Sequence, residues 1–99
     1  MKISRSKGKK NLISLKIDGK LDIYTVKEFK EQIKVFINTN NDLELDCQGI
    51  EKLDSAGYQM IVFLHREVNE IGRKLNIIKP SEDMKQVFNL YNEESLLSE

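Results

Sequence analysis

Two segments of the sequence alternate strictly between apolar and polar residues, and each is followed by a stretch with helical spacing. Strict alternation predicts a strand with one buried face. The helical stretches cover residues 26–37 and 56–71, whose periodic apolar residues are typical of a helix that packs one side on a core. Strand–helix–strand units with right-handed crossovers place their strands parallel in one sheet. The predicted inward residues of the strands, two of them from a further strand over residues 74–79, are Ile13, Leu15, Ile17, Leu43, Leu45, Cys47, Leu75 and Ile77.

Weaker signals flank this unit at both ends. Residues 1–5 form a candidate edge strand, and turn chemistry at Gly8 predicts that it pairs antiparallel with the next strand. A helix is expected from Ser81 onwards, after the strand over residues 74–79. The sequence therefore predicts one α/β domain over residues 1–99, with a mixed β-sheet of about four strands and about three packed helices in the order ββαβαβα.

Capping patterns predict how the first two helices begin. Thr25 and Glu28 have the spacing of a capping box, and Tyr24 and Phe29 are placed for a hydrophobic staple across it. At the second helix, Ser55 is the predicted N-cap, because its hydroxyl precedes the first apolar residues of the helical stretch. Both helices are therefore expected to start at a hydroxyl residue.

The charge balance and the single cysteine restrict the class of function. The chain has 16 Lys and Arg residues against 16 Asp and Glu residues, which indicates no general attraction to nucleic acid or to an anionic membrane. One cysteine excludes an internal disulfide and a multi-cysteine zinc site, and it suits a reducing cytoplasm. The basic N-terminus is no secretory signal, and no apolar run approaches the roughly 20 residues that span a bilayer. We expect a cytoplasmic protein without membrane insertion, nucleic-acid partner, metal or cofactor.

Small and polar residues surround the predicted start of the second helix. Asp54 precedes Ser55, and Ala56 and Gly57 follow it. A serine at a helix start is ordinary, but these small neighbours leave its hydroxyl and the backbone accessible to something large. This stretch is therefore the first candidate for a functional site.

The sequence resembles the STAS domain, the family of anti-sigma factor antagonists, over nearly the whole chain. The stretches that carry the resemblance are Gly19-Lys20-Leu21-Asp22, which breaks the first clear strand, then Leu45-Asp46, Leu53-Asp54-Ser55-Ala56-Gly57 and Lys79-Pro80-Ser81. Within them, the Asp-Ser-Ala-Gly motif after an apolar strand end is the specific part.

The resemblance implies a partner-switching function. In this family the serine or threonine of the motif is phosphorylated by an anti-sigma factor that is also a serine kinase; the unmodified form binds that kinase, and a serine phosphatase restores it. By matching positions, Ser55 is the phospho-acceptor, and Asp22 and Asp54 are the nearby acids. Two other functions fit the same resemblance: a STAS adaptor of a chemosensory or other signalling module, and a structural subunit of a lipid-transport ATPase complex.

An enzymatic function is not expected. Ser55, Asp54 and His65 supply the residue types of a nucleophilic triad, but His65 lies ten residues further along the same predicted helix. At 1.5 Å rise per residue this separates them by about 15 Å, whereas a general base must come within about 3 Å. The region around Gly8 lacks the pattern of a phosphate-binding loop.

The partner is expected to contact the first turns of the second helix. Helical phase places Val62 almost opposite the core side and Phe63 at its border. The core side itself is predicted to hold Met60, Ile61, Leu64, Val68 and Ile71. The predicted partner-binding residues are Asp22, Asp54, Ala56, Gly57, Tyr58, Gln59, Val62 and Phe63.

Overall fold

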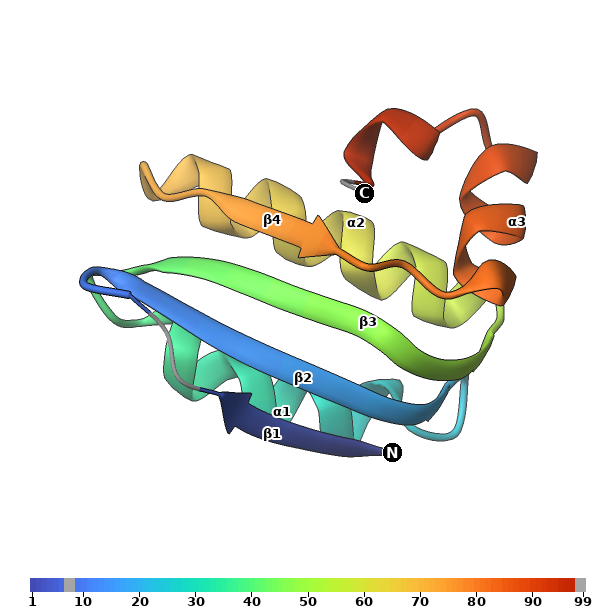
Figure 1. Cartoon of the computed structure of the whole chain (residues 1–99), viewed down its shortest axis with the longest axis horizontal. Coiled ribbons are helices and arrows are strands. Elements are labelled where there is room, and N and C mark those ends of the chain that lie inside the picture. The colour runs from blue at the N-terminus through green and yellow to red at the C-terminus, as the bar shows by residue number, and fades with distance from the viewer. Residues whose placement is uncertain (7–8, 98–99) are drawn as a thin grey trace.

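The computed structural model describes residues 1–6 and 9–97, and over these residues the predicted order of strands and helices is confirmed (Figure 1). The elements are β1 (Lys2–Ser6), β2 (Leu12–Leu21), α1 (Val26–Ile37), β3 (Asp42–Leu53), α2 (Ser55–Glu70), β4 (Leu75–Ile78), α3 (Glu82–Leu90) and a 3-10 turn η1 (Glu94–Leu96). The predicted turn at Gly8 lies outside the described residues.

The four strands form one mixed sheet in the order β1-β2-β3-β4. β1 pairs antiparallel with β2, and β2, β3 and β4 are parallel to one another. Leu15, Leu45 and Ile77 stand beside one another in this register and point to the same face of the sheet. Figure 1 shows α1 and α2 behind the sheet and α3 beyond the end of β4. α1 and α2 therefore cover one face, and the alternating polar residues of β2 and β3 occupy the other.

The core lies between the sheet and the helices, and the inward strand residues predicted from the sequence are all buried in it, with at most 4% of each exposed. Phe29 and Ile33 of α1 and Met84 and Phe88 of α3 complete this core with no exposed surface. Cys47 is also fully buried. Burial, and then the charge of neighbouring Asp46, raises the pKa of its thiol to about 12, so the thiol stays protonated and behaves as a small apolar group.

Both central strands are longer than the sequence predicts. Gly19 does not end β2, because its positive φ of 107° carries the chain through an irregularity in the β2–β3 register, and pairing continues to Leu21 opposite Leu53. β2 and β3 therefore end side by side. The turn from β2 into α1 and the start of α2 are brought together by this shared end.

The predicted capping box and hydrophobic staple of α1 are wrong. Thr25 makes no side-chain cap bond to the helix. Its hydroxyl instead accepts a hydrogen bond from the Asp22 N–H at 3.0 Å and donates to the Lys20 carbonyl at 3.0 Å. Tyr24 is 90% exposed and therefore cannot staple the helix to the core. Thr25 stabilises the turn that leaves β2 rather than the helix that follows it.

Candidate functional site

The two acids that the sequence assigned to the site come together at the shared end of β2 and β3. Asp22 directly follows Leu21 and Asp54 directly follows Leu53, and the two leucines are paired in the sheet. The Ile23 N–H donates a hydrogen bond of 3.0 Å to Asp54 Oδ2. The turn after β2 is therefore fixed to the residue that opens α2.

Asp54, and not Ser55, is the N-cap of α2. Asp54 has an extended backbone, and its Oδ1 accepts a hydrogen bond of 2.9 Å from the Gly57 N–H. The prediction of a Ser55 cap is wrong by one residue. Since aspartate caps helices as well as serine does, two adjacent capping residues left the sequence ambiguous, and the length of β3 decided between them.

Ser55 is the first residue of α2, and it is exposed. Within residues 1–6 and 9–97 its hydroxyl forms no hydrogen bond, because the cap bond already belongs to Asp54. The free N–H groups of a first helical turn, together with the helix dipole, favour an anion at this point. The site therefore offers an accessible, unengaged hydroxyl in surroundings that tolerate a negative charge.

Gly57 allows α2 to start very close to β2. A Cβ at this position would collide with the Leu21 carbonyl oxygen and would lie 2.8 Å from Leu53 Cδ1. Gly57 is buried, so its role in the structure is close packing of the helix on the strand ends. Its predicted contact with a partner stays a prediction.

Tyr58 is directed into the molecule. Its ring stacks on Tyr91 with centroids 4.2 Å apart and meets the edge of Phe88 at 4.9 Å. Only 9% of Tyr58 is exposed. The first turn of α2 is thereby fixed to α3, and a partner reaches little of this ring.

A shallow hollow of about 380 Å³ adjoins the Ser55 end, between α2 and the beginning of α1. The predicted partner-binding residues Ala56, Gln59 and Phe63 line it. Ile23 also lines it and is 62% exposed. Ile23 is a candidate contact that the sequence-based prediction missed; the available signal was an apolar residue directly after Asp22 in a turn. Met60, expected on the core side, is half-buried and lines the same hollow.

Val62 lies on the other flank of α2, and the expectation of an outward position opposite the core is wrong. Val62 is half-buried, packs against the core and lines a hollow with Leu96 of η1. Ile71, expected in the core, is 53% exposed because α2 ends at Glu70 and the chain turns at Gly72 with a φ of 77°. Whether Val62 contacts a partner stays a prediction.

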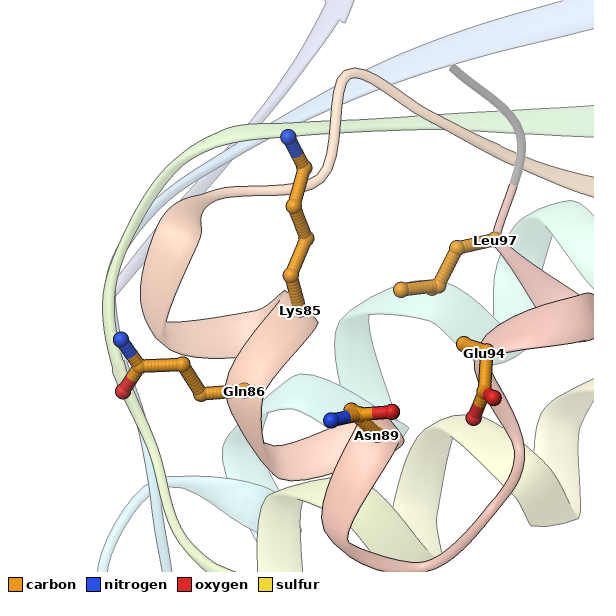
Figure 2. A pocket seen from close by; sticks show the side chains of 5 residues that line it. All are labelled: Lys85, Gln86, Asn89, Glu94 and Leu97. Atoms are coloured by element: carbon orange, nitrogen blue, oxygen red, sulfur yellow. The ribbon is translucent and has the colours of Figure 1, made fainter.

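A further hollow of about 470 Å³ lies away from these residues (Figure 2). Lys85, Gln86 and Asn89 of α3 border it on one side, and Glu94 and Leu97 of the C-terminal segment border it on the other. Leu97 forms a parallel bridge with Ile77 of β4. None of the predicted site residues lines this hollow.

The structure keeps Ser55 and His65, the candidate triad residues, apart on α2. Ser55 and His65 lie on one continuous helix, so about 15 Å of helix rise separates them. His65 Nδ1 is 3.3 Å from Asn69 Nδ2, one turn further on. No group of three or more His, Cys, Asp or Glu residues in the described part of the chain is placed to hold a metal ion. Among the same residues, no helix has the length and apolar character needed to cross a membrane.

Comparison with known proteins assigns the family. Residues 5–97 match the family model of the STAS domain, and the chain belongs to the STAS family.

Solved structures with the same fold include proteins named for sigma-factor control. TM1081 of Thermotoga maritima, provisionally described as an anti-sigma factor antagonist, superposes with a TM-score of 0.84 at 21% identity, over 97% of this chain and 83% of that chain. The anti-sigma factor antagonist SpoIIAA in its unphosphorylated form gives a TM-score of 0.78 at 15% identity, over 98% and 86% of the two chains. The Bacillus cell fate determinant SpoIIAA in its phosphorylated form gives 0.74 at 16% identity, over 98% and 89%. At these identities the likeness shows the fold.

Proposed function

We propose that this chain is an anti-sigma factor antagonist that binds an anti-sigma factor with serine-kinase activity and is released from it by phosphorylation of Ser55. The observation that carries the proposal is the exposed Ser55 hydroxyl, which makes no hydrogen bond within the described residues because Asp54 caps the helix. A kinase can take up this hydroxyl without first breaking an internal contact. The proposal also draws support from the similar SpoIIAA structures, one of which is a phosphorylated form.

Phosphorylation would leave the fold in place while changing the surface. A phosphate adds about 1.5 to 2 negative charges and three acceptor oxygens, and the N-terminus of α2 accommodates an anion there. A partner carboxylate about 6 Å away would meet a repulsion on the order of 1–5 kcal/mol, for effective dielectric constants of about 80 to 20. Since about 1.4 kcal/mol corresponds to tenfold in affinity, this change is large enough to release a partner.

The surface that the partner would cover surrounds Ser55 on two sides. Asp22 and Asp54 make one side acidic, and the hollow lined by Ile23, Ala56 and Phe63 makes the other side apolar. Such a combination suits a protein partner, because an apolar contact supplies affinity while the neighbouring charges set orientation. A serine phosphatase that acts on phosphorylated Ser55 would restore this surface.

The direct test is phosphorylation of the full chain by its anti-sigma factor kinase with ATP. One phosphate is expected, mapped to Ser55 by peptide mass spectrometry. Ser55→Ala should abolish the phosphate and still bind the kinase. Ser95→Ala is the matched control, since Ser95 is also exposed, and it should be phosphorylated as the wild type is.

Binding measurements complete the test. Ser55→Asp should fold normally and bind the kinase more weakly than Ser55→Ala, because it places one negative charge where the phosphate would be. Phosphatase treatment of the phosphorylated chain should restore wild-type affinity. Equal affinities for wild type, Ser55→Ala, Ser55→Asp and the phosphorylated chain would contradict the proposal.

A further inference from the structure

A groove runs between α1 and α2 from the Ser55 end towards the end of α1. It consists of two adjoining hollows of about 380 and 210 Å³, which share Lys30 and Phe63 in their linings. We call it the α1–α2 groove and define it by Val26, Lys30, Lys34, Met60, Phe63 and Glu67. The half-buried side chains of Val26, Met60 and Phe63 form its apolar floor, and these side chains also pack against the core.

The α1 side of the groove is positively charged. Lys30 and Lys34 lie one turn apart on α1 and are both exposed. Lys30 Nζ lies 5.0 Å from the centroid of the Phe63 ring, a cation–π contact that holds the ammonium over the floor. In the described part of the chain, no ion pair joins either lysine to a carboxylate. Two positive charges, neither held in an ion pair within the described residues, therefore border an apolar floor.

The acids of α1 do not line the groove. Glu28 accepts a hydrogen bond of 3.0 Å from Gln32 on α1, and neither Glu28 nor Glu31 lines either hollow. On the α2 side, Glu67 contributes one negative charge. The groove is therefore asymmetric in charge, with a basic edge along α1 and an acidic residue along α2.

The shape and charge of the groove favour one kind of occupant. α1 has 12 residues, about 18 Å of helix, which matches about three turns of a partner helix laid alongside. Such a helix places apolar anchors on one side at spacings of three and four residues, and its acidic row would face the lysines. An anionic membrane surface fits less well, because Glu67 lines the groove and the chain has no net charge.

We propose that the α1–α2 groove binds an acidic amphipathic helix of a partner protein, with its apolar side on Met60 and Phe63 and its carboxylates facing Lys30 and Lys34. The groove begins beside Ser55 and overlaps the apolar hollow of the proposed kinase surface, but its charged edge is formed by Lys30 and Lys34 of α1. It gives the domain a second way to hold a partner, with a charge preference opposite to that of the acidic Ser55 end.

The test uses two synthetic helical peptides of about three turns with identical leucine positions. One carries glutamates along one flank of the leucine row, and the other carries lysines there. Each is titrated into the ¹⁵N-labelled full chain. The acidic peptide should shift the amide signals of Lys30, Met60 and Phe63, and its affinity should fall as salt rises. The lysine peptide should bind at least about fivefold more weakly, since each exposed pair contributes modestly.

Charge reversal supplies the matched comparison. Lys30→Glu/Lys34→Glu should weaken binding of the acidic peptide about tenfold and strengthen binding of the lysine peptide. Lys2→Glu/Lys16→Glu makes the same change in net charge at two exposed positions on the open face of the sheet, and it should leave the affinities of both peptides unchanged. Phe63→Ala should weaken both peptides if it keeps the wild-type amide spectrum outside the groove.

Several results would overturn the proposal: equal affinities for the two peptides, no binding of either, or equal effects of the two double variants. Binding to vesicles of phosphatidylcholine and phosphatidylglycerol with the same dependence on Lys30 and Lys34, but no binding of the acidic peptide, would assign the groove to a membrane instead. Lysine-dependent self-association in sedimentation would assign it to a second copy. Phosphorylation of Ser55 is measured separately on Lys30→Glu/Lys34→Glu, so that failure of the groove and failure of the proposed kinase substrate are distinguished.

Discussion

Two helices of this protein begin with the same residue types in exchanged roles. At α2, Asp54 caps the helix through the Gly57 N–H, and Ser55 stands exposed beside it with a free hydroxyl. At α3, Ser81 is the cap, accepting the Met84 N–H at 3.3 Å. The aspartate of α3 makes a contact outside its own helix, since Asp83 Oδ2 accepts the Leu53 N–H at 2.7 Å.

The exchange of roles gives the two serines different functions in the structure: Ser81 caps a helix, and Ser55 does not. Ser81 is occupied by the helix that it starts, whereas the hydroxyl of Ser55 is left free because the residue before it forms the cap. Asp83 joins α3 to the last residue of β3, and Asp54 joins α2 to the turn after β2. Each aspartate therefore stabilises the region around the site, and only Ser55 is left without an internal partner among these helix starts.

The largest losses of stability are expected at Met84 and Gly57, the residues whose N–H groups donate to the two helix caps. Met84 is fully buried, so Met84→Ala should lower the free energy of unfolding by about 2–5 kcal/mol through the cavity it leaves. Gly57→Ala should cost about 3 kcal/mol for the opposite reason, because its methyl group collides with the Leu21 carbonyl. Urea unfolding measures both. Wild-type stability of Gly57→Ala would show that α2 does not start as close to β2 as described.

Removing either cap should lower the free energy of unfolding by a smaller amount, and the two losses should differ. Asp54 accepts two backbone hydrogen bonds, from Gly57 and Ile23, whereas Ser81 accepts one from Met84. Asp54→Ala should therefore cost about 2 kcal/mol and Ser81→Ala about 1 kcal/mol, within the range measured for lost caps. Thermal unfolding of the two variants side by side checks the order. The reverse order would show that the second hydrogen bond of Asp54, from the Ile23 N–H, adds no stability.

The smallest effect is expected at Ser55. Since its hydroxyl forms no hydrogen bond in the described structure, Ser55→Ala should change the free energy of unfolding by less than about 0.5 kcal/mol. Ser81→Ala, measured in the same urea titration, provides the contrast. A loss near 1 kcal/mol in Ser55→Ala would mean that the serine shares the capping role and is less available to a kinase.

The strand order and the buried face of the sheet were predictable because they depend on periodic residues. Ile13, Leu15, Leu43 and Leu45 alternate with polar neighbours, and a strand with one covered face must bury them all on the same side. The start of α3 at Ser81 was predictable for a related reason: Pro80 precedes it, and no other capping residue competes directly before it.

The details of the site were less predictable because they depend on where strands end. Asp54 and Ser55 can both cap a helix, and only the continuation of β3 to Leu53 makes Asp54 the cap. Likewise, Val62 has an outward helical phase when α2 is considered alone, but it packs against the core and shares a hollow with Leu96, from a segment more than thirty residues later. Such tertiary contacts leave no local periodic signal.

The hydrogen bond from Ile23 to Asp54 has a consequence for the entropy of recognition. It joins residues separated by 31 positions, so the turn after β2 and the first turn of α2 form one preformed surface. Ordering a free backbone costs about 1–2 kcal/mol per residue. Because these residues are already ordered, docking of a partner does not incur this cost. Association then requires mainly side-chain adjustment, and more of the contact energy remains as affinity.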